Sequence, residues 1–220
     1  MHTTIKKTSP VSGREDGRET RARIIECAGR LFAQNGYANT TSKEICQLAH
    51  VNQSAVNYHF GGLNGLHIAV LEEVQIYLVN IDIMTRLYHS DASPRQKVER
   101  LLAFFWEDTC RRDDWHVRAW IREILDPSPC IGQVISSKAL PKFRILTQIL
   151  SDYLGYDTTD PRLYSCLITL IAPFSLIFIT QDNPIRQYLP VRFPQDEFLE
   201  LLKKNTLAIL GTLRNPDKKR

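Results

Sequence analysis

The fold is decided by the stretch TSKEICQLAHVNQSAVNYHFGGLNGL, residues 41–66. Thr41 and Glu44 have the spacing of a capping box, in which two side chains satisfy the unpaired amides at the start of a helix. The residues behind this cap that share or flank one apolar helical face are Ile45, Cys46, Leu48 and Ala49. The pattern stops at His50, so it predicts a first helix of about two turns.

A second short helix is predicted directly after this break. Asn52 is placed to cap it, and its inner face is apolar, formed by Ala55, Val56 and Phe60. Two such helices joined by about three or four residues are typical of a helix-turn-helix. The outer face is polar and uncharged, with Gln53, Ser54, Asn57 and Tyr58. Because Gln and Asn can bond bidentately to adenine in the major groove, this helix is a candidate for base recognition; a solvated helix face is the alternative.

The longer stretch TRARIIECAGRLFAQNGYANTTSKEICQLAHVNQSAVNYHFGGLNGLHIAVL, residues 20–71, resembles the DNA-binding head of the TetR family of transcriptional regulators. The segments LFAQNGYANTT and NYHF carry most of this resemblance. It implies a three-helix head on a larger helical bundle, with a double-stranded DNA operator, a small-molecule effector and a second copy of the chain as partners. It also implies seven DNA-contacting residues, namely Ser42, Lys43, Gln53, Ser54, Asn57, Tyr58 and His59.

The sequence departs from the family pattern at three positions in this region, His50, Asn57 and Leu63. His50 occupies a turn position where glycine is usual, so a left-handed backbone there would carry strain. Asn57 replaces a tyrosine that is common in the recognition helix. Leu63 stands where a lysine often binds phosphate, which removes one expected contact with the DNA backbone.

The length and charge of the chain are compatible with a small head on a larger domain. The chain has 220 residues, 43% of them hydrophobic, and a formal net charge of +4. Residues 1–64 hold eight Lys or Arg and five Asp or Glu, so most of the positive excess lies in the expected head. This balance is compatible with phosphate binding and would not indicate it alone.

Cysteine usage and hydropathy predict a cytoplasmic chain. The five cysteines are odd in number, scattered and without close pairing, which favours reduced thiols over a disulfide framework. Residues 1–19 are polar and charged and do not resemble a signal peptide. The longest apolar run, residues 167–179, is interrupted by polar residues and is too short to span a bilayer, so we expect no membrane partner.

The chain is predicted to be all-α, with no convincing strand. We expect a flexible arm over residues 1–17, a helix-turn-helix DNA-binding domain over 18–64 and a helical ligand-binding and dimerisation domain over 65–215. Outside the helix-turn-helix, helices are expected at residues 18–35, 66–89, 93–113, 114–125, 131–154 (with a bend at Pro141), 161–180 and 195–213.

A cluster of aromatic and polar residues is the candidate ligand pocket, because pockets are mostly apolar with a few placed polar groups. Its predicted lining is Phe105, Trp106, Cys110, His116, Trp120, Arg122, Phe174 and Phe178. This lining favours a hydrophobic or aromatic effector whose anionic group would pair with Arg118, Arg122 or His116. Ordinary core packing of bulky residues is the alternative.

Neither a metal, a cofactor nor a catalytic site is expected. Cys46 and His50 have a spacing that could hold a metal, but no third ligand lies near them in the sequence. Cys110 and His116 could form a nucleophile and base, yet no glycine elbow or paired catalytic carboxylates accompany them. The sequence therefore favours the hypothesis of a regulator over that of an enzyme with a helical head.

The last two expected helices carry more apolar surface than one bundle face needs, which predicts pairing with a second copy across a two-fold axis. The predicted dimer interface is Leu167, Leu170, Ile171, Phe198, Leu202, Ile209 and Leu213. The alternative is that a single chain buries both helices. The favoured function is a DNA-binding repressor released from its operator by a small molecule, and a regulator that takes a protein or cysteine-redox signal is the second hypothesis.

Overall fold

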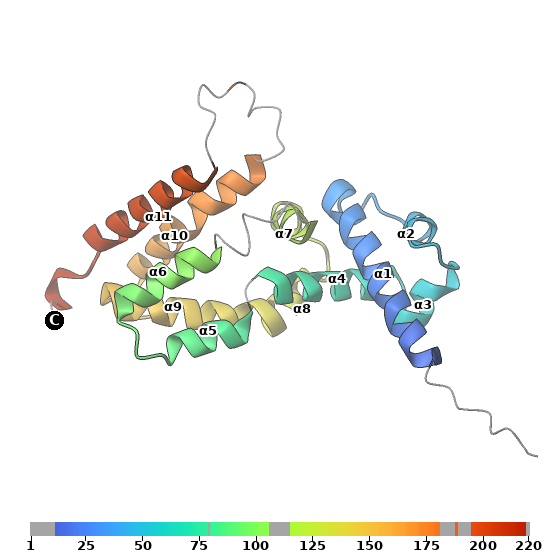
Figure 1. Ribbon diagram of the computed structural model, residues 1–220, viewed down its shortest axis with the longest axis horizontal. Coiled ribbons are helices and arrows are strands. Elements are labelled where there is room, and N and C mark those ends of the chain that lie inside the picture. Colours follow the sequence, from blue (N-terminus) through green and yellow to red (C-terminus); the bar gives the residue numbers. More distant parts are fainter. Residues whose placement is uncertain (1–11, 79, 106–114, 181–187, 189–194, 219–220) are drawn as a thin grey trace, which may run out of the picture.

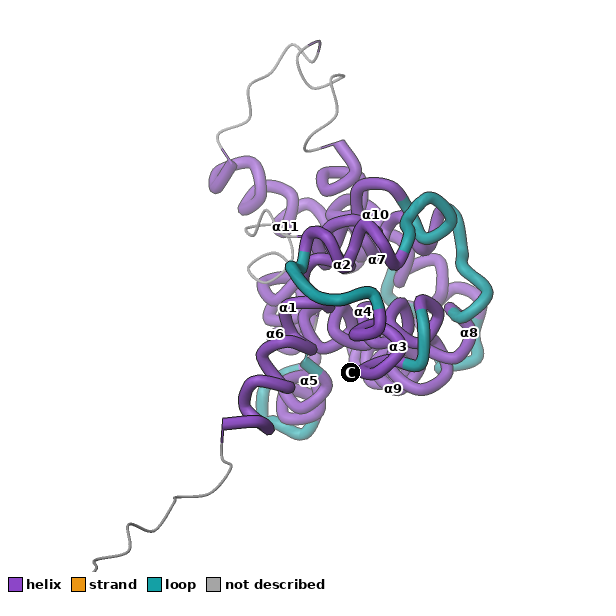
Figure 2. The backbone as a smooth tube through the Cα atoms, turned by 90° about the vertical axis from the view of Figure 1, so that its right-hand side faces the viewer, coloured by secondary structure: helices purple, strands orange, loops and turns teal. Residues whose placement is uncertain are grey.

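The computed structural model describes residues 12–78, 80–105, 115–180, 188 and 195–218. In these ranges it consists of helices and loops without a strand, as Figure 2 shows, so the all-α prediction is confirmed. The α-helices are α1 (Ser12–Asn35), α2 (Ser42–Leu48), α3 (Ser54–Phe60), α4 (Leu63–Leu78), α5 (Ile81–Tyr88), α6 (Pro94–Phe104), α7 (Trp115–Leu125), α8 (Ile131–Val134), α9 (Leu140–Leu154), α10 (Pro161–Thr180) and α11 (Gln195–Thr212). A π-helical turn, η2 (Ile135–Ala139), joins α8 to α9, and a 3-10 turn, η4 (Pro216–Lys218), follows α11.

The helices form an elongated molecule with a head at one end and a bundle at the other (Figure 1). Helices α1, α2 and α3 make the head, and α5, α6, α9, α10 and α11 make the bundle. Helices α4 and α7 lie between the two and pack against each other and against α1. The head is therefore joined to the bundle by packed helices in addition to the chain connection.

The first helix begins earlier than the sequence predicted. Helix α1 starts at Ser12, so the expected boundary at residue 18 is wrong and residues 12–17 belong to the helix; residues 1–11 of the expected arm lie outside the described part. The segment SGREDG has no apolar face, which is why hydrophobic periodicity missed it. Its acids, Glu15 and Asp16, lie near the positive end of the helix dipole, where negative charge is stabilising.

The expected single helix over residues 66–89 is wrong, because the structure has two helices, α4 and α5, over this range. Asn80 adopts an extended backbone with φ −69° and ψ 124°, and its side chain accepts a hydrogen bond of 2.8 Å from the backbone N–H of Asp82. Asn80 is thus an N-cap that starts a new helix. The apolar pattern continues through the break, so it gave no sign of it.

The segment from α8 to α9 departs from the predicted continuous helix in a related way. Pro141 has no N–H to donate to a carbonyl of the preceding turn, so regular α-helical bonding cannot pass through it. The chain widens into the π-helical turn Ile135–Ala139 just before the proline, which refines the expected bend. Helices α10 and α11 match their predicted ranges to within one residue. The helix expected over 93–113 begins as α6 with Ser93 as its N-cap, and residues 106–113 lie outside the described residues.

Two apolar cores meet at α7. The head core is built from α1, α2, α3 and α4, with Ile24, Ala28, Phe32, Ile45, Val56, Leu66 and Val70 among its buried residues. Trp115 and Ala119 of α7 also belong to this head core, while Val117 belongs to the bundle core. A Cβ atom built on Gly29 of α1 would lie 2.3 Å from the Trp115 ring, so only glycine lets the two helices approach this closely. Helix α7 is therefore shared by both halves of the molecule.

Candidate functional site

The capping box predicted at the start of α2 is present. The backbone N–H and the hydroxyl of Thr41 donate to the Glu44 carboxylate at 2.8 and 2.7 Å, and the Glu44 N–H donates to the Thr41 hydroxyl oxygen at 3.3 Å. The side-chain hydrogen bond from Thr41, followed by the backbone one, lowers the pKa of Glu44. These bonds fix the first turn of α2, from which Ser42 and Lys43 project.

The turn between α2 and α3 has the left-handed residue that the sequence predicted. His50 has φ 53°, the positive-φ position that a non-glycine residue adopts with strain. The backbone N–H of Val51 donates to the carbonyl of Cys46 at 3.0 Å, and that of His50 donates to the carbonyl of Gln47 at 3.3 Å. This pair of bonds is the Schellman arrangement that closes a helix, and it sets the angle at which α3 leaves the turn.

The start of α3 differs in one residue from the prediction. Asn52 was expected to cap the helix, but Gln53 occupies the N-cap position with helical backbone angles and without a side-chain capping bond. Gln53 can therefore direct its side chain away from its own helix. Gly61 ends the helix in the left-handed conformation with φ 73°.

The polar face of α3 points outward, as its sequence pattern predicted. Gln53, Ser54 and Asn57 are exposed, Tyr58 is 85% exposed, and Val56 on the opposite face is buried. His59 is half-buried, with its ring 4.9 Å from that of Tyr58 in an edge-to-face arrangement. Contact of these residues with DNA stays a prediction.

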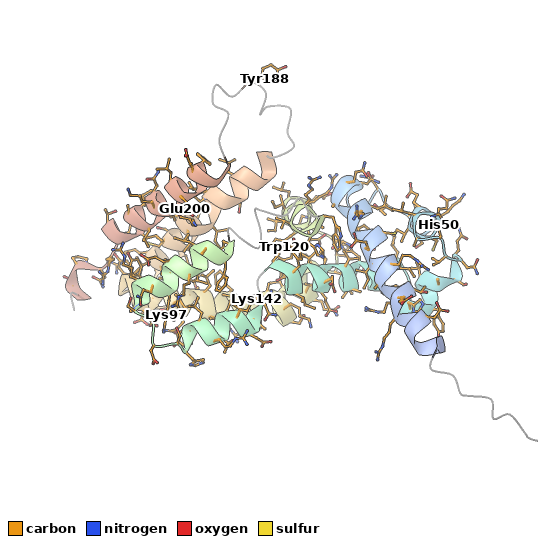
Figure 3. All side chains as sticks on the ribbon, viewed as in Figure 1. His50, Lys97, Trp120, Lys142, Tyr188 and Glu200 are labelled. Atoms are coloured by element: carbon orange, nitrogen blue, oxygen red, sulfur yellow. The ribbon has the colours of Figure 1, made fainter. Side chains whose placement is uncertain are left out.

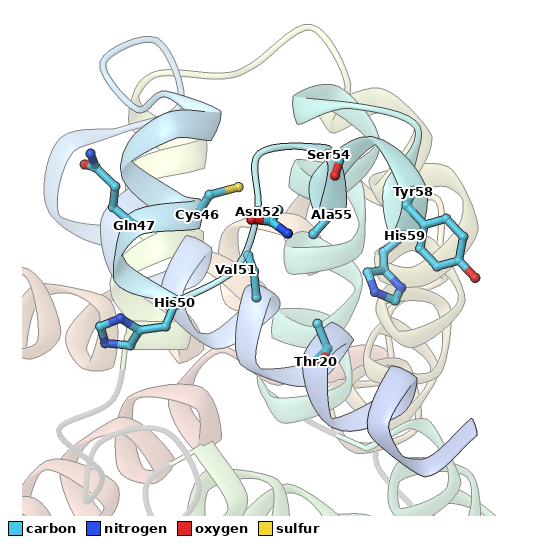
Figure 4. A pocket seen from close by; sticks show the side chains of 10 residues that line it. All are labelled: Thr20, Cys46, Gln47, His50, Val51, Asn52, Ser54, Ala55, Tyr58 and His59. Carbon is cyan, nitrogen blue, oxygen red and sulfur yellow. The ribbon is translucent and has the colours of Figure 1, made fainter. Parts of the chain in front are cut away.

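A hollow of about 700 Å³ lies beside this face, bounded by α1, the turn and α3 (Figure 4). Its lining is Thr20, Cys46, Gln47, His50, Val51, Asn52, Ser54, Ala55, Tyr58 and His59. Thr20, on α1, was not singled out from the sequence, since a lone threonine on a helix carries no motif. Arg21 follows it, with its guanidinium 5.1 Å from the centre of the Phe60 ring, and places a positive charge near the end of α3.

A second cavity, of about 270 Å³, lies where α4, α7, α9 and α10 meet. Its lining is Gln75, Leu78, Met84, Phe105, Val117, Trp120, Ile121, Ile124, Ala139, Lys142, Phe143, Leu146, Ile171 and Ser175. Phe105 and Trp120 are thus brought to one cavity, as expected. Trp106 and Cys110 lie outside the described residues, and so do the side chains of Phe174 and Phe178.

Two polar residues of the predicted pocket lie elsewhere. His116 is buried and stacked on Tyr77 and Trp115, with ring centroids 4.0 and 3.6 Å apart. Arg122 donates from Nη1 to the carbonyl of Gln34 at 3.0 Å, so it joins α7 to the end of α1. Neither residue lines the 270 Å³ cavity, because both lie on the face of α7 turned toward the head. This corrects their assignment to the pocket.

The polar groups that do line the cavity were missed by the sequence reading. Lys142 of α9 donates from Nζ to the backbone carbonyl of Gln75, and burial lowers the pKa of the lysine to about 8. Gln75 is 4% exposed, and its side-chain nitrogen has no hydrogen-bond partner among the described residues. Single polar residues inside amphipathic helices carry no motif, so only the spatial arrangement shows that these two meet.

A buried polar cluster joins α4 to α7 and to the loop that follows α7. His67 Nε2 lies 3.0 Å from a carboxylate oxygen of Glu123, and the other oxygen accepts hydrogen bonds from the backbone and hydroxyl of Ser128. The Ser128 hydroxyl is also 3.2 Å from the thiol of Cys130. The cluster ties α4, the helix that leaves the head, to α7.

The four described cysteines do not favour the redox hypothesis. Burial raises the pKa of each thiol, those of Cys27, Cys46, Cys130 and Cys166. A reactive cysteine needs the thiolate form, which these environments disfavour. Cys110 lies outside the described residues.

The predicted dimer residues divide into two groups. Leu167 and Leu170 are buried in the core of the chain itself, while Ile171, Phe198 and Leu202 are partly buried against that core. Ile209 and Leu213 are exposed. Further exposed apolar residues on α10 and α11 are Tyr164, Ile168, Leu176 and Leu201. An intermolecular face on these helices could therefore include the predicted Ile209 and Leu213, whereas Leu167 and Leu170 are already buried within the chain.

No helix in the described ranges has both the length and the apolar character needed to cross a bilayer. No group of three or more His, Cys, Asp or Glu side chains in the same ranges is arranged to hold a metal ion.

Comparison with known proteins places two family models on this chain. Residues 24–70 match the model described as bacterial regulatory proteins, tetR family, which covers the head. Residues 92–200 match the C-terminal domain of the HTH-type transcriptional dual regulator CecR, which covers most of the bundle.

Individual relatives are similar over part of their length. The chain is 36% identical over 123 residues to the HTH-type transcriptional repressor Rv3405c of Mycobacterium tuberculosis, covering 56% of this chain and 54% of the relative. It is 29% identical over 96 residues to the HTH-type transcriptional repressor NicS of Pseudomonas putida, covering 44% of each. The matched region therefore spans about half the length of these relatives.

Solved structures share the whole architecture. FadR from Bacillus subtilis, in complex with stearoyl-CoA, superimposes with a TM-score of 0.67 over 88% of this chain and 99% of its own, at 15% identity. AmtR of Mycobacterium smegmatis gives a TM-score of 0.62 over 94% of this chain and 90% of its own, at 13% identity. At such identities the likeness supports the fold alone.

Proposed function

We propose that this chain, which belongs to the TetR family of bacterial regulatory proteins, is a DNA-binding transcriptional repressor that a small molecule releases from its operator. The observation that carries the proposal is the outward polar face of α3, with Gln53, Ser54 and Asn57 exposed at the end of a capped helix-turn-helix. Two relatives that match about half of the chain are named as transcriptional repressors.

The DNA-contacting residues divide by chemistry. Gln53, Ser54 and Asn57 present amide and hydroxyl groups from the first turns of α3 and read base edges in the major groove. Ser42, Tyr58 and His59 hold phosphates, and Lys43 serves either role. The exposed Arg21 on α1 adds a further positive charge beside the same face.

Two copies of the chain act together as a homodimer. Exposed apolar side chains on α10 and α11, among them Ile168, Leu176, Leu201 and Ile209, are the surface that a second copy would cover. A two-fold dimer would present two recognition helices to half-sites one helical turn apart, about 34–36 Å, or a multiple of that distance. Because the operator is chromosomal DNA, the working compartment is the cytoplasm.

Helices α4 and α7 connect the head to the bundle, so ligand binding can release the operator through them. A Cβ on Gly65 of α4 would lie 1.9 Å from the carbonyl oxygen of Phe60, so α4 begins in direct contact with the end of α3. The same helix reaches the 270 Å³ cavity at Gln75, and α7 reaches it at Trp120. A ligand that binds one arrangement of α4 and α7 better than another shifts the population of head positions. A coupling of about 1–3 kcal/mol would weaken operator binding several-fold or more.

A gel-shift experiment separates a regulator from an enzyme with a helical head. The probes are a fragment of the DNA upstream of the chain's own gene and a random fragment of equal length, at fixed salt. Selective retardation of the upstream fragment supports the proposal. Equal retardation of both, or none, counts against it for this operator. Light scattering at micromolar concentration tests assembly, and a monomer mass would contradict the homodimer.

A further inference from the structure

The 270 Å³ cavity is lined mainly by apolar residues and has one polar corner, formed by Gln75 and Lys142. Its described lining includes Trp120, Phe143 and Leu146 among many apolar residues, and Gln75, Lys142 and Ser175 as polar ones. No Asp or Glu belongs to this lining. Figure 3 shows Trp120 and Lys142 near the junction between head and bundle, and both line this cavity.

Among the described residues that line the cavity, none offers Lys142 a charge of opposite sign. Lys142 is half-buried, and the bond that the structure gives its ammonium is to the neutral backbone carbonyl of Gln75. A partly desolvated ammonium without a carboxylate is costly, because it has lost water and gained only one dipole. Any anion placed beside it would recover that cost.

The side-chain amide of Gln75, which lies beside Lys142, also lacks a hydrogen bond among the described residues. The side-chain nitrogen of Gln75 is buried and has no acceptor among the described residues, although buried polar groups are normally hydrogen-bonded. Gln75 and Lys142 come from α4 and α9, and both line the cavity. Two donors, an ammonium and an amide, thus meet at one end of an apolar space, and a carboxylate has the two acceptor oxygens to satisfy both.

The polar corner also faces the outside. Gln75 and Lys142 line a second hollow of about 340 Å³, together with Ile76, Asn80, Ile81, Asp82, Ser137 and Lys138. Of its other charged groups, Asp82 is exposed, and Lys138 lies 3.6 Å from Glu72. Lys142 therefore stands between a polar entrance and the apolar interior, where the head group of an amphipathic ligand would come to rest.

We propose that the cavity binds an apolar carboxylic acid, with the hydrocarbon part against Trp120 and Phe143 and the carboxylate on Lys142 and Gln75. The inference rests on the proposed function for its regulatory meaning, since it names the class of effector for the same cavity. From the sequence we expected Arg118, Arg122 or His116 of α7 to pair with an anionic group. The polar corner assigns that role to Lys142 of α9 instead.

The position of Lys142 gives this ligand a route to the head. The carbonyl of Gln75 lies in the last turn of α4, where carbonyls have no partner within the helix and favour cations. A carboxylate bound to the ammonium competes with that carbonyl and loosens the tie between α9 and α4. Helix α4 is the element that continues directly from the recognition helix, so this exchange alters the position of the head.

Matched acids and amides test the ligand class. Isothermal titration calorimetry of the full chain would compare octanoate with octanamide, and 4-phenylbutanoate with 4-phenylbutanamide, at neutral pH. We expect each acid to bind about tenfold or more tightly than its amide, the preference of a charge-assisted pair over a neutral one. Equal binding of acid and amide, or no binding of any of the four, overturns the proposal.

Variants assign the preference to one side chain. Lys142→Met keeps most of the length of the side chain without its charge and should reduce the acid-to-amide ratio to about one. Lys138 lies outside the cavity lining, so Lys138→Met should keep the ratio. Lys142→Gln serves if the methionine variant does not fold. An unchanged preference in the Lys142 variants overturns the assignment.

The same probes separate this inference from the repressor function. Acids that bind through Lys142 yet leave the DNA complex intact in a gel shift would support the ligand class and contradict release by such ligands. Release of DNA by acid and amide at equal concentration would support the repressor and contradict the acid-binding corner.

Discussion

Glu123 of α7 and His67 of α4 form a buried pair, with Oε2 of the carboxylate 3.0 Å from Nε2 of the imidazole. The side chains are 4% and 2% exposed, and the Glu123 carboxylate also accepts two hydrogen bonds from Ser128. The pair thus joins the helix that follows the recognition helix to the helix that lines the ligand cavity. His67 in turn packs its ring against Phe32 of α1, 4.6 Å between centroids, so the contact continues into the head.

Glu123→Gln should lower the free energy of unfolding at pH 7 by about 1.5–3 kcal/mol, the usual worth of a hydrogen bond to a charged group. Burial raises the pKa of Glu123, but the hydrogen bonds from His67 and Ser128 and the charge of His67 outweigh it, so the pKa is lowered overall. The stabilisation is therefore present above the unfolded pKa and is lost as the pH falls through the folded one. Urea unfolding at pH 7 and at pH 4 and below measures this.

The control for this prediction is Glu99→Gln. Glu99 forms an exposed pair with Arg95 at 2.9 Å, of the kind that contributes about 0–1 kcal/mol. A difference between wild type and Glu123→Gln that stayed constant down to acid pH would show that the carboxylate charge is not the stabilising feature.

His50→Gly should stabilise the chain by about 0.5–1 kcal/mol. A non-glycine residue at φ 53° destabilises the folded state by about 1–2 kcal/mol. Glycine removes this strain, but its greater conformational freedom in the unfolded chain offsets part of the gain. Thermal unfolding would show a higher Tm for His50→Gly. His50→Ala keeps the Cβ atom and should give no such gain; equal gains in both variants would mean that the histidine side chain, rather than the backbone, causes the strain.

Gly29→Ala should destabilise the protein by about 1–3 kcal/mol, as expected for overpacking. The new methyl would stand 2.3 Å from the ring of Trp115, so either α7 or the ring must move. Gly17→Ala on the same helix has nothing within 4 Å and should stabilise by about 0.5–1 kcal/mol through helix propensity. Chemical denaturation of the two variants compares them, and a loss of similar size in both would place the effect in the helix and not in the contact with α7.

Local signals in the sequence were sufficient for the helix-turn-helix, although they missed the start of α1 and the N-cap residue of α3. The Thr41–Glu44 capping box, the left-handed His50 and the outward face of α3 each follow from residues within a few positions of one another. The break at Asn80 was missed because the apolar steps on either side stay in phase, so periodicity cannot distinguish one long helix from two in line.

Long-range pairing explains why the cavity could be predicted only in part. Aromatic residues such as Phe105 and Trp120 mark an apolar pocket by their composition alone. The polar corner needs Gln75 and Lys142, which are far apart in the chain and meet only through the packing of α9 on α4. In the same way, whether Leu167 faces a partner or its own core depends on which helices cover α10, and the sequence pattern does not contain that information.

Asn57→Ala is the sharpest test of the DNA-binding face. The residue is exposed, lies on the outer side of α3 and is uncharged, so its removal should leave the fold and the electrostatic attraction to phosphate intact. Loss of a bidentate base contact costs about 1–3 kcal/mol, which is roughly a fivefold to 150-fold weaker affinity for the operator.

The expected signature of a base contact is selectivity. Affinity for random DNA should stay unchanged in Asn57→Ala, and the preference for the base at one operator position should relax. Lys43→Ala is the matched comparison: if Lys43 holds a phosphate, its loss weakens binding to all sequences alike and reduces the salt dependence by about one counterion. Titration of both variants against operator and random duplexes at two salt concentrations distinguishes them. If Asn57→Ala lost affinity equally for both duplexes, the side chain would position the head on the DNA backbone, and base recognition would have to rest on Gln53 and Ser54.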